Sequence, residues 1–287
     1  MVSAEEIAAD AQRLAALALA EDGARDLTSL VTVVPDQRGR ARIVARSAVV
    51  ASGIVYADAL LFAAELPTAE WRTGDGDHVE AGGTICHLHG PLAGLFRAER
   101  PMLNMLQRAC GVATLTSRFV DAIAPARCVV LHTRKTTPGL RILEIAAVLD
   151  GGGKMHRRDL AGALLVKDNH WAAMQTSGRT LAEALEAARR AGARMLGVEV
   201  ETSDELDTAC AAGATRLLID NQTPDIVREW SARARQLSPG IEIEASGGIT
   251  LDNAREYAMA GADFISVGAL TGSPPRVDLS MEVRSEK

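Results

Sequence analysis

Residues 128–170 read CVVLHTRKTTPGLRILEIAAVLDGGGKMHRRDLAGALLVKDNH, and two apolar runs in this stretch, 128–132 and 163–167, end in polar or charged residues. Glycine and proline accompany the basic residues, which indicates that these residues lie in loops rather than inside helices or strands. A group of cations at loops favours a binding site for a molecule with several negative charges. The group comprises Arg134, Lys135, His156, Arg157 and Lys167.

Each of the two runs predicts a strand, and the same strand-then-helix pattern recurs toward the C-terminus. Helix-start signals separate the runs, among them the pair Thr180 and Glu183, then Ser203, Pro224 and Asp252. This alternation predicts a parallel sheet or an α/β barrel. Because the carboxyl ends of barrel strands meet on one face, residues far apart in the sequence can share one pocket. The further predicted strands span residues 197–201, 217–220, 241–245 and 264–267.

The ends of these later strands carry groups suited to a phosphorylated ligand. Glu199 and Asp220 lie in otherwise apolar runs, and burying a carboxylate is costly unless a cation or donor lies nearby. Ribose hydroxyls or Mg²⁺ would satisfy them, and a buried ion pair with the basic residues is the structural alternative. Glycine at a strand end lets backbone N–H groups approach a phosphate. We assign this role to Ser246, Gly247, Gly248, Val267, Gly268 and Ala269, with Thr133 as a further contact.

The first part of the chain predicts a separate small domain. An N-terminal helix begins at a Ser3–Glu6 capping box, with Ile7, Leu14, Leu17 and Leu19 as candidate buried positions. Short strands follow, together with a helix near residues 55–64, and a helix over 98–123 then leads into the barrel. The predicted strands are 41–45, 49–53 and 84–88; the predicted domains are 1–115 and 116–274, with the tail 275–287 packing back on the first.

Composition narrows the classes of function. A net charge of −6 and an aromatic content of 3% argue against a nucleic-acid partner, which would require a basic or base-stacking surface. The four cysteines are widely spaced and contain no Cys-x-x-Cys, which predicts reduced, mostly buried thiols in the cytoplasm. We expect no membrane association, because no apolar run reaches the ~20 residues of a spanning helix and no signal peptide is recognisable.

Taken together, these motifs resemble the quinolinate phosphoribosyltransferase family, also called nicotinate-nucleotide pyrophosphorylase (carboxylating). The matching segments run in family order over about residues 20–280. They are ER at 99–100, LN at 103–104, LQ at 106–107, TRKTTPGL at 133–140, GGG at 151–153, HR at 156–157, KDNH at 167–170, VEVE at 198–201, LIDN at 218–221, EASGG at 244–248 and ISVGAL at 265–270.

The resemblance implies an open α/β barrel joined to an α/β sandwich domain, in a homodimer or hexamer whose sites are shared between subunits. It implies transfer of phosphoribose from phosphoribosyl pyrophosphate to quinolinate with Mg²⁺, giving nicotinate mononucleotide, pyrophosphate and CO₂ for NAD biosynthesis. Mg²⁺ would be held mainly through the substrate, with Glu199 or Asp220 as candidate protein ligands.

The resemblance also assigns residues to roles. Arg134, His156, Arg157 and Lys167 would bind the two carboxylates of quinolinate, and Lys135 would lie near the acceptor or the pyrophosphate. Arg100 would reach the site of the neighbouring subunit. The residues assigned to catalysis are Lys135, Lys167, Glu199 and Asp220; those assigned to substrate binding are Arg100, Thr133, Arg134, Lys135, His156, Arg157, Lys167, Glu199 and Asp220.

Four positions depart from the family pattern: Pro101, His132, Met155 and Asp159 stand where the family usually has Thr, Asp, Asn and Gly. A relative with a different acid or base acceptor therefore remains an alternative. Two readings of another class also remain. One is a Schiff-base aldolase that uses Lys167 as its amine, and the other is a non-catalytic binding protein that keeps the fold.

Overall fold

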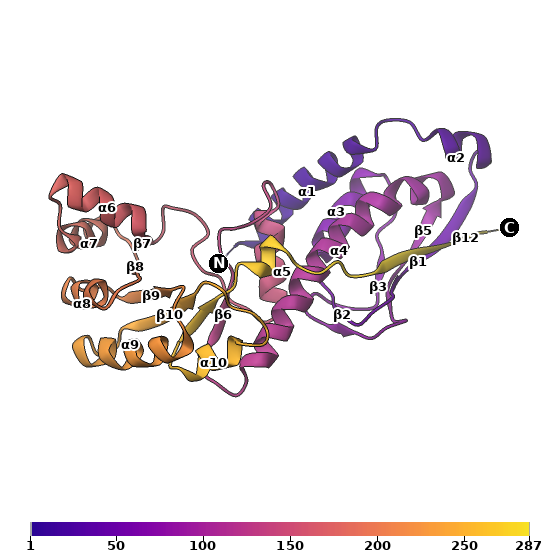
Figure 1. Cartoon of the computed structure of the whole chain (residues 1–287). Helices are drawn as coiled ribbons and strands as arrows, with labels where there is room; N and C mark the ends of the chain where they lie inside the picture. Colours follow the sequence, from indigo (N-terminus) through magenta and orange to yellow (C-terminus); the bar gives the residue numbers. More distant parts are fainter. Residues whose placement is uncertain (1, 287) are drawn as a thin grey trace. The chain divides into compact units, whose positions relative to one another are not determined.

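The structure, a computed structural model, describes residues 2–286 and separates them into two compact units (Figure 1). The first unit contains the described residues up to Ser117, the segment Thr136–Gly152 and the residues from Leu270 onward; the second contains Arg118–Lys135 and Gly153–Ala269. The division falls inside the long helix α4 (Leu92–Ile123), close to the domain boundary predicted at 115 and 116.

The second unit is built on a parallel sheet with the strand order β6-β11-β10-β9-β8-β7. Consecutive strands are neighbours except β6 and β7, which lie at opposite edges, so the sheet forms a barrel that is open between them. The predicted open α/β barrel is therefore confirmed. The strands are β6 (Val129–Leu131), β7 (Leu164–Val166), β8 (Leu196–Val200), β9 (Arg216–Asp220), β10 (Glu242–Ser246) and β11 (Phe264–Ser266).

Helices connect these strands, and their local start signals work as predicted. Thr180 and Glu183 form a capping box at the start of α7, and Pro224 is the first residue of α9. Thr202 caps α8, which begins at Ser203, whereas the last helix begins two residues after Asp252. The helices are α6 (Asp168–Ser177), α7 (Leu181–Arg190), α8 (Ser203–Ala211), α9 (Pro224–Leu237) and α10 (Ala254–Met259). The short α11 (Ala269–Gly272) follows the last strand, at the boundary with the first unit.

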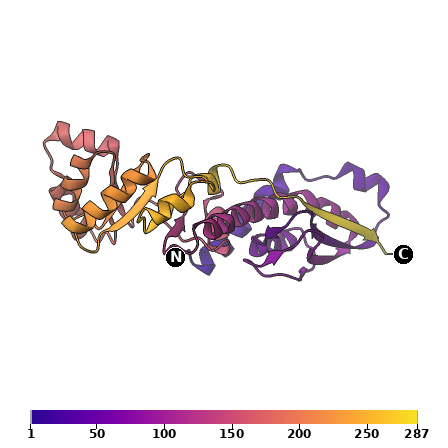
Figure 2. The same ribbon diagram turned by 60° about the horizontal axis from the view of Figure 1, so that its bottom comes forward.

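The first unit has an antiparallel sheet in the order β12-β1-β5-β3 and a small pair, β2 and β4. Burial alternates along the first part of β1, and its buried Gly39 lies against Leu92 and Leu95 of α4, so one face of the sheet is covered by helix and the other meets solvent. The C-terminal strand returns to pair with β1, beside which it runs in both views (Figures 1 and 2). The strands are β1 (Arg38–Ala45), β2 (Val49–Val50), β3 (Glu70–Trp71), β4 (His78–Val79), β5 (Thr84–Pro91) and β12 (Leu279–Ser285).

The remaining helices of the first unit are α1 (Ala4–Glu21), α2 (Leu27–Thr32), α3 (Ile54–Ala63) and α5 (Arg141–Asp150), of which α2 and α5 were not predicted. The predicted Ser3–Glu6 capping box is present. The prediction that Leu17 is buried was wrong, since it is 51% exposed. Two residues correspond to about 200° of helical rotation, so Leu17 lies opposite the fully buried Ala15.

All four cysteines are free and buried, as predicted. Burial raises the pKa of Cys86, Cys110 and Cys128 to about 12, which leaves these thiols protonated and unreactive at neutral pH. Within residues 2–286, no helix combines the length and apolar character needed to cross a membrane.

Candidate active site

A cavity of about 300 Å³ lies in the second unit and is lined by strand ends and the loops that follow them. It gathers all five residues of the basic group that the sequence predicted, together with acids and hydroxyls from the later strands. The lining residues are His132, Thr133, Arg134, Lys135, His156, Arg157, Leu165, Lys167, Leu218, Asp220, Glu244, Ser246 and Ser266.

Strand register explains why the later residues meet. In neighbouring parallel strands, residues at one level project to the same face. Leu218 pairs in register with Glu199 and with Glu244, and two residues further on Ser246 pairs with Asp220 and with Ser266. These two levels form one surface of the sheet, which places three strand ends around the cavity.

Lys167 follows β7 directly, and its ammonium forms an ion pair with Glu199 Oε2. The Glu199 side chain is 6% exposed and the Lys167 side chain 41%, so the acid is enclosed while the lysine still reaches the cavity. The backbone oxygen of Glu199 also accepts a hydrogen bond of 3.0 Å from Trp171 Nε1. The sequence predicted a nearby cation for Glu199, and Lys167 is that cation.

Glu244, at the centre of β10, is fully buried and has three polar partners. His156 Nε2 lies 3.1 Å and Arg216 Nη1 3.3 Å from Glu244 Oε2, and the hydroxyl of Ser266 donates to Oε1. Burial by itself would raise the pKa of Glu244, but the hydrogen bonds from His156 and Ser266 and the charge of Arg216 hold it below its ordinary value. Glu244 is therefore ionised and fixes the groups around it.

The tautomer of His156 follows from its two contacts. Its Nδ1 accepts a 2.6 Å hydrogen bond from the backbone N–H of Arg157, so Nδ1 carries no proton in this arrangement. Nε2 must then carry the proton that it donates to Glu244. A role for His156 was predicted from the sequence, but nothing there indicated that a carboxylate 88 residues away orients its ring.

Arg134 and Arg157 bring like charges into the cavity. Burial lowers the pKa of Arg157, the nearby charge of Arg134 lowers it further, and Glu244 and Glu199 oppose both effects. Arg134 Nε is a buried donor with no hydrogen-bond acceptor within residues 2–286. An unpaired buried donor costs free energy, and an anionic ligand would both accept its hydrogen bond and relieve the repulsion.

The glycine loop after β10 is held against the end of β9. Asn221 has a positive φ of 54°, donates a hydrogen bond of 2.9 Å from its backbone to Ser246, and donates from Nδ2 to Asp220 at 2.6 Å. Gly247 has φ +86°, and a Cβ there would lie 2.1 Å from Asn221 Oδ1. Only glycine fits at this position.

Replacing Gly247 by alanine should displace Asn221 and destabilise the protein by about 2 kcal/mol or more, because steric overlap adds to the strain of a positive φ. Gly248→Ala is the matched control: its φ is also positive, at +62°, but no atom lies within 4 Å of its added Cβ. Urea denaturation of both variants measures the difference. Equal losses of stability would contradict the role given to the contact with Asn221.

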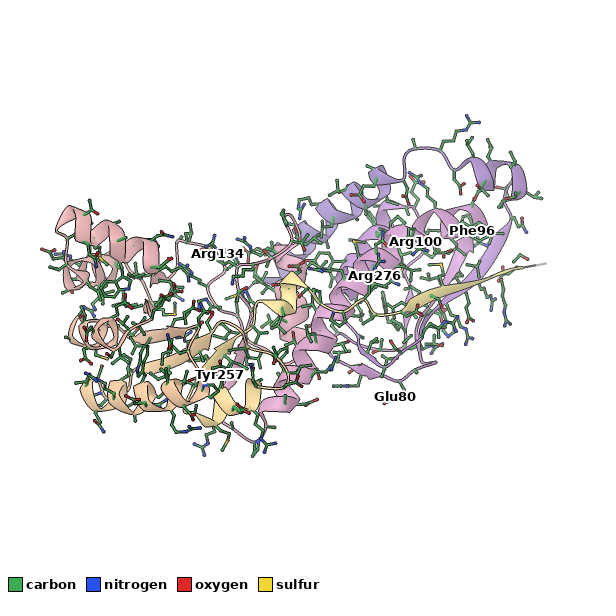
Figure 3. The ribbon with its side chains drawn as sticks, in the orientation of Figure 1. Glu80, Phe96, Arg100, Arg134, Tyr257 and Arg276 are labelled. Atoms are coloured by element: carbon green, nitrogen blue, oxygen red, sulfur yellow. The ribbon has the colours of Figure 1, made fainter. Side chains whose placement is uncertain are left out.

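The other assigned residues are placed as follows. Thr133 Oγ1 accepts a hydrogen bond of 3.2 Å from the Lys135 backbone, and both side chains lie beside Gly268. The backbone N–H of Val267 donates to Leu131 at 3.1 Å, so the strand ladder uses it and it is not a phosphate donor. Ala269 is the exposed first residue of α11. Arg100 lies exposed on α4 in the first unit, and Arg134 lies in the second (Figure 3).

The sequence analysis assigned no role to three polar side chains of this cavity: Glu244, Ser266 and His132. A signal for Glu244 was present, because it is a carboxylate inside an apolar run, as Glu199 is. Of the four departures from the family pattern, His132 is the one among the residues that line the cavity. No cluster of three or more His, Cys, Asp or Glu side chains suited to a metal ion occurs within residues 2–286.

Comparison with known proteins identifies the family. The model of the quinolinate phosphoribosyl transferase N-terminal domain matches residues 26–110, and that of the C-terminal domain matches residues 112–282. A probable nicotinate-nucleotide pyrophosphorylase [carboxylating] of Bacillus subtilis (strain 168) is 39% identical, over 92% of this chain and 90% of the relative. A quinolinate phosphoribosyltransferase [decarboxylating] of Nicotiana glauca is 34% identical, over 96% of this chain and 83% of the relative.

Comparison with solved structures identifies the same family as the sequence comparisons. The nicotinate-nucleotide pyrophosphorylase from Francisella tularensis superimposes with a TM-score of 0.89 at 32% identity, covering 96% of this chain and 97% of that one. Matches to both domain models and a shared fold over nearly the whole length leave one conclusion: the chain belongs to the quinolinate phosphoribosyltransferase family.

Proposed function

We propose that this protein transfers the 5-phosphoribosyl group of phosphoribosyl pyrophosphate to quinolinate, releasing pyrophosphate and CO₂ and forming nicotinate mononucleotide for NAD biosynthesis. The observation that carries the proposal is the cavity of the second unit, where Arg134, His156, Arg157 and Lys167 converge in a chain that belongs to this family. Quinolinate carries two adjacent carboxylates, and this group of donors is complementary to them.

Within this proposal Arg134 and Arg157 each grip a carboxylate through paired N–H donors, and Lys167 adds a point charge. Thr133, Lys135, Ser246, Gly247, Gly248, Gly268 and Ala269 are the proposed contacts of the phosphate groups. Val267 shapes this loop, while its backbone N–H donates to Leu131. Asp220 and Glu199 face the ribose, where a carboxylate stabilises positive charge.

Mg²⁺ is the proposed cofactor, and the acids of the cavity fit a metal that arrives with the substrate. Mg²⁺ is commonly bound by one or two carboxylates plus substrate phosphates rather than by an all-protein cage. Asp220 lines the cavity and would hold it, whereas Glu199 is already engaged by Lys167. When bound, Mg²⁺ supplies charge stabilisation for the pyrophosphate.

The reaction requires positioning and electrostatics rather than a covalent enzyme nucleophile. The quinolinate nitrogen forms a bond to C1 of the ribose as the C1–O bond breaks and its electron pair leaves with pyrophosphate. Asp220 and Glu199 stabilise the positive charge on the ribose, and Lys135 and Thr133 stabilise the departing anion. CO₂ then leaves the ring, and the electron pair of the broken bond stays on the ring carbon, where the adjacent cationic nitrogen stabilises it until that carbon takes up a proton.

The test is an acceptor screen with phosphoribosyl pyrophosphate and Mg²⁺, scoring nucleotide by mass together with pyrophosphate and CO₂. Quinolinate is expected to give all three products in equal amounts, and removal of Mg²⁺ by a chelator should stop the reaction. A nucleotide of another acid would instead favour the alternative acceptor, for which His132 in the cavity wall is the specific observation. Binding of both substrates without product would favour a non-catalytic relative.

The aldolase reading is disfavoured by the ion pair at Lys167. A Schiff-base lysine must be uncharged to attack a carbonyl, whereas Lys167 faces the enclosed carboxylate of Glu199. Borohydride trapping of a substrate adduct on Lys167 would overturn this argument.

The proposed assembly is a homodimer or hexamer in the cytoplasm, in which Arg100 enters the site of a neighbouring subunit. The exposure of Arg100 on α4 supports its availability, and four free cysteines support a reducing compartment. Arg100→Ala and Arg134→Ala should each be nearly inactive alone, because each removes a guanidinium from the acceptor site. When the two variants are mixed and allowed to exchange subunits, about a quarter of wild-type activity should return. Half of the dimers are then hybrids, and one of the two sites in each hybrid is intact.

The matched control mixes Arg134→Ala with Lys167→Ala, both of which alter the second unit. No recovery is expected there, because every site in the hybrid carries one of the two changes. Failure of the first mixture to recover activity would refute the shared site.

A further inference from the structure

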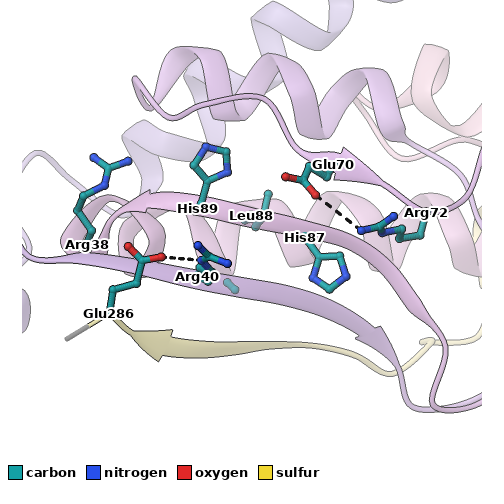
Figure 4. Close-up of a pocket in the computed structure, with 9 residues that line it drawn as sticks. Arg38, Arg40, Glu70, Arg72, His87, Leu88, His89 and Glu286 are labelled. Carbon is teal, nitrogen blue, oxygen red and sulfur yellow. Dashed lines mark hydrogen bonds and ion pairs between the residues drawn. The ribbon is translucent and has the colours of Figure 1, made fainter.

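The solvent face of the first-unit sheet carries a second concentration of basic side chains. Arg38, Arg40 and Arg42 alternate with buried residues along β1, so all three project to solvent. Antiparallel pairing sets Arg40 opposite His89 and Arg42 opposite His87 on β5. A depression of about 570 Å³ lies on this face (Figure 4). It is lined by Arg38, Arg40, Ala41, Glu70, Arg72, His87, Leu88, His89 and Glu286.

The charge of this depression is opposite to that of the whole chain. Three arginines line it against two glutamates, Glu70 and Glu286, and its two histidines add charge when protonated. The whole chain carries a net charge of −6. The depression is therefore a local positive field on an acidic protein, which attracts small anions.

An anionic ligand can displace the glutamates from the two ion pairs within the depression. Arg40 Nε lies 2.6 Å from Glu286 Oε1, and Arg72 Nη2 lies 3.7 Å from Glu70 Oε2. The two arginine side chains are 78% and 57% exposed, and ion pairs this exposed contribute little to stability. A phosphate can replace either carboxylate and accept the two parallel hydrogen bonds that a guanidinium can donate.

The spacing of the cations indicates how many anionic groups would fit. Alternate residues of a strand lie about 7 Å apart, and paired strands lie about 5 Å apart. Arg38, Arg40 and His89 thus present donors over a span that one phosphate cannot cover. We propose that this depression binds a small anion with two or more phosphate groups, at a site separate from the cavity of the second unit.

Other ligand classes fit less well. No Phe, Tyr or Trp is among the lining residues, so the depression lacks the large aromatic side chains on which bases commonly stack. His87, His89 and the two glutamates are not part of a potential metal site, because none occurs within residues 2–286, and three arginines would repel a cation.

The experiment is calorimetric titration of the intact protein with inorganic triphosphate at pH 6.5 and low salt. We expect two classes of site, since the second-unit cavity is also basic. The double change Arg40→Gln with His89→Gln should weaken one class about tenfold or more, through loss of charge-assisted hydrogen bonds. It should leave phosphoribosyl transfer unchanged, whereas Arg134→Gln should weaken the other class.

Arg228→Gln is the matched control, because Arg228 is 57% exposed and paired with Asp225 as Arg40 is with Glu286. This control variant should leave the triphosphate affinity of both classes of site unchanged. Equal weakening by Arg228→Gln would show non-specific attraction and overturn the proposal, as would unchanged titrations of the double variant. Thermal unfolding of each variant checks that it is folded. Because this experiment measures binding and not turnover, a failure of the binding proposal can be distinguished from a failure of the proposed phosphoribosyl transfer.

A second arm varies pH. Histidine is the side-chain type that ordinarily changes charge between pH 6 and 8, and two histidines, His87 and His89, line the depression. The charged groups around them are Arg38, Arg40, Glu70, Arg72 and Glu286 in the depression and the neighbouring Arg42, Glu282 and Arg284. Affinity at this site should fall as the pH rises, and the fall should disappear in a variant with glutamine at both histidines. A pH-independent affinity would exclude the histidines from the site.

Discussion

Replacing Lys167 by alanine is expected to lower kcat/KM for phosphoribosyl transfer by about 100-fold or more. The change removes a cation from the acceptor cavity and at the same time leaves Glu199 without its ion-pair partner. An enclosed, unpaired carboxylate would then repel the anionic acceptor. Steady-state kinetics with both substrates measures the effect, which should fall largely on the KM for quinolinate.

A double-mutant cycle separates the two causes. Glu199→Gln in the Lys167→Ala background removes the uncompensated charge, so it should restore part of the lost acceptor binding even though two charged groups are gone. Lys154→Ala serves as the control, because Lys154 is exposed and does not line the cavity. Strictly additive losses would show that Lys167 and Glu199 act independently.

Replacing Glu244 by glutamine is expected to cost about 3 kcal/mol of stability, because breaking a buried pair leaves its partners uncompensated. Arg216 would retain Glu242, from which Nη2 lies 2.7 Å away, whereas the glutamine amide would offer a single acceptor oxygen to the two donors, His156 and Ser266, and would turn an NH₂ toward the other. Urea denaturation measures the loss of stability. The KM for the acceptor should also rise, since the His156 ring is held less firmly.

The stability difference between the wild type and Glu244→Gln should change with pH in a definite direction. The pKa of Glu244 is lowered in the folded protein, so its contribution is present above the ordinary carboxyl value of 4.5 and is lost as the pH falls through the folded value. The stability difference between wild type and Glu244→Gln should therefore narrow on acidification below about pH 4.5. The exposed Glu229 offers a control, and Glu229→Gln should show neither the loss nor the narrowing.

Local elements of this fold were predictable because their signals lie within a few residues of one another. The Thr180–Glu183 capping box, the proline that begins α9 and the apolar runs of β6 to β11 each act over one helical turn or one strand. By contrast, α5 was missed, because its start at Arg141 has no side-chain cap hydrogen bond. The burial of Leu17 was misjudged, because apolar character alone does not say which face of a helix is covered.

The candidate site also has features that were predictable from the sequence and features that were not. Polar residues at strand ends predicted Arg134, Lys167, Glu199 and Asp220 as site residues, because a buried charge in an apolar run requires a nearby cation or donor. Their partners could not be read from the sequence. Which cation meets Glu199, and the fact that Glu244 orients His156, depend on contacts between residues that are 32 and 88 positions apart.

By itself, then, the sequence determined the alternation of strands and helices, their caps and the identity of the charged groups. Only the tertiary structure decided that the Val267 N–H donates to the strand ladder, that the returning C-terminal tail forms β12 and pairs with β1, and that arginines and histidines share one solvent face of the first-unit sheet. The physical reason is that backbone preferences act within a turn or a strand, whereas side-chain pairing between distant segments is fixed by sheet register and barrel curvature.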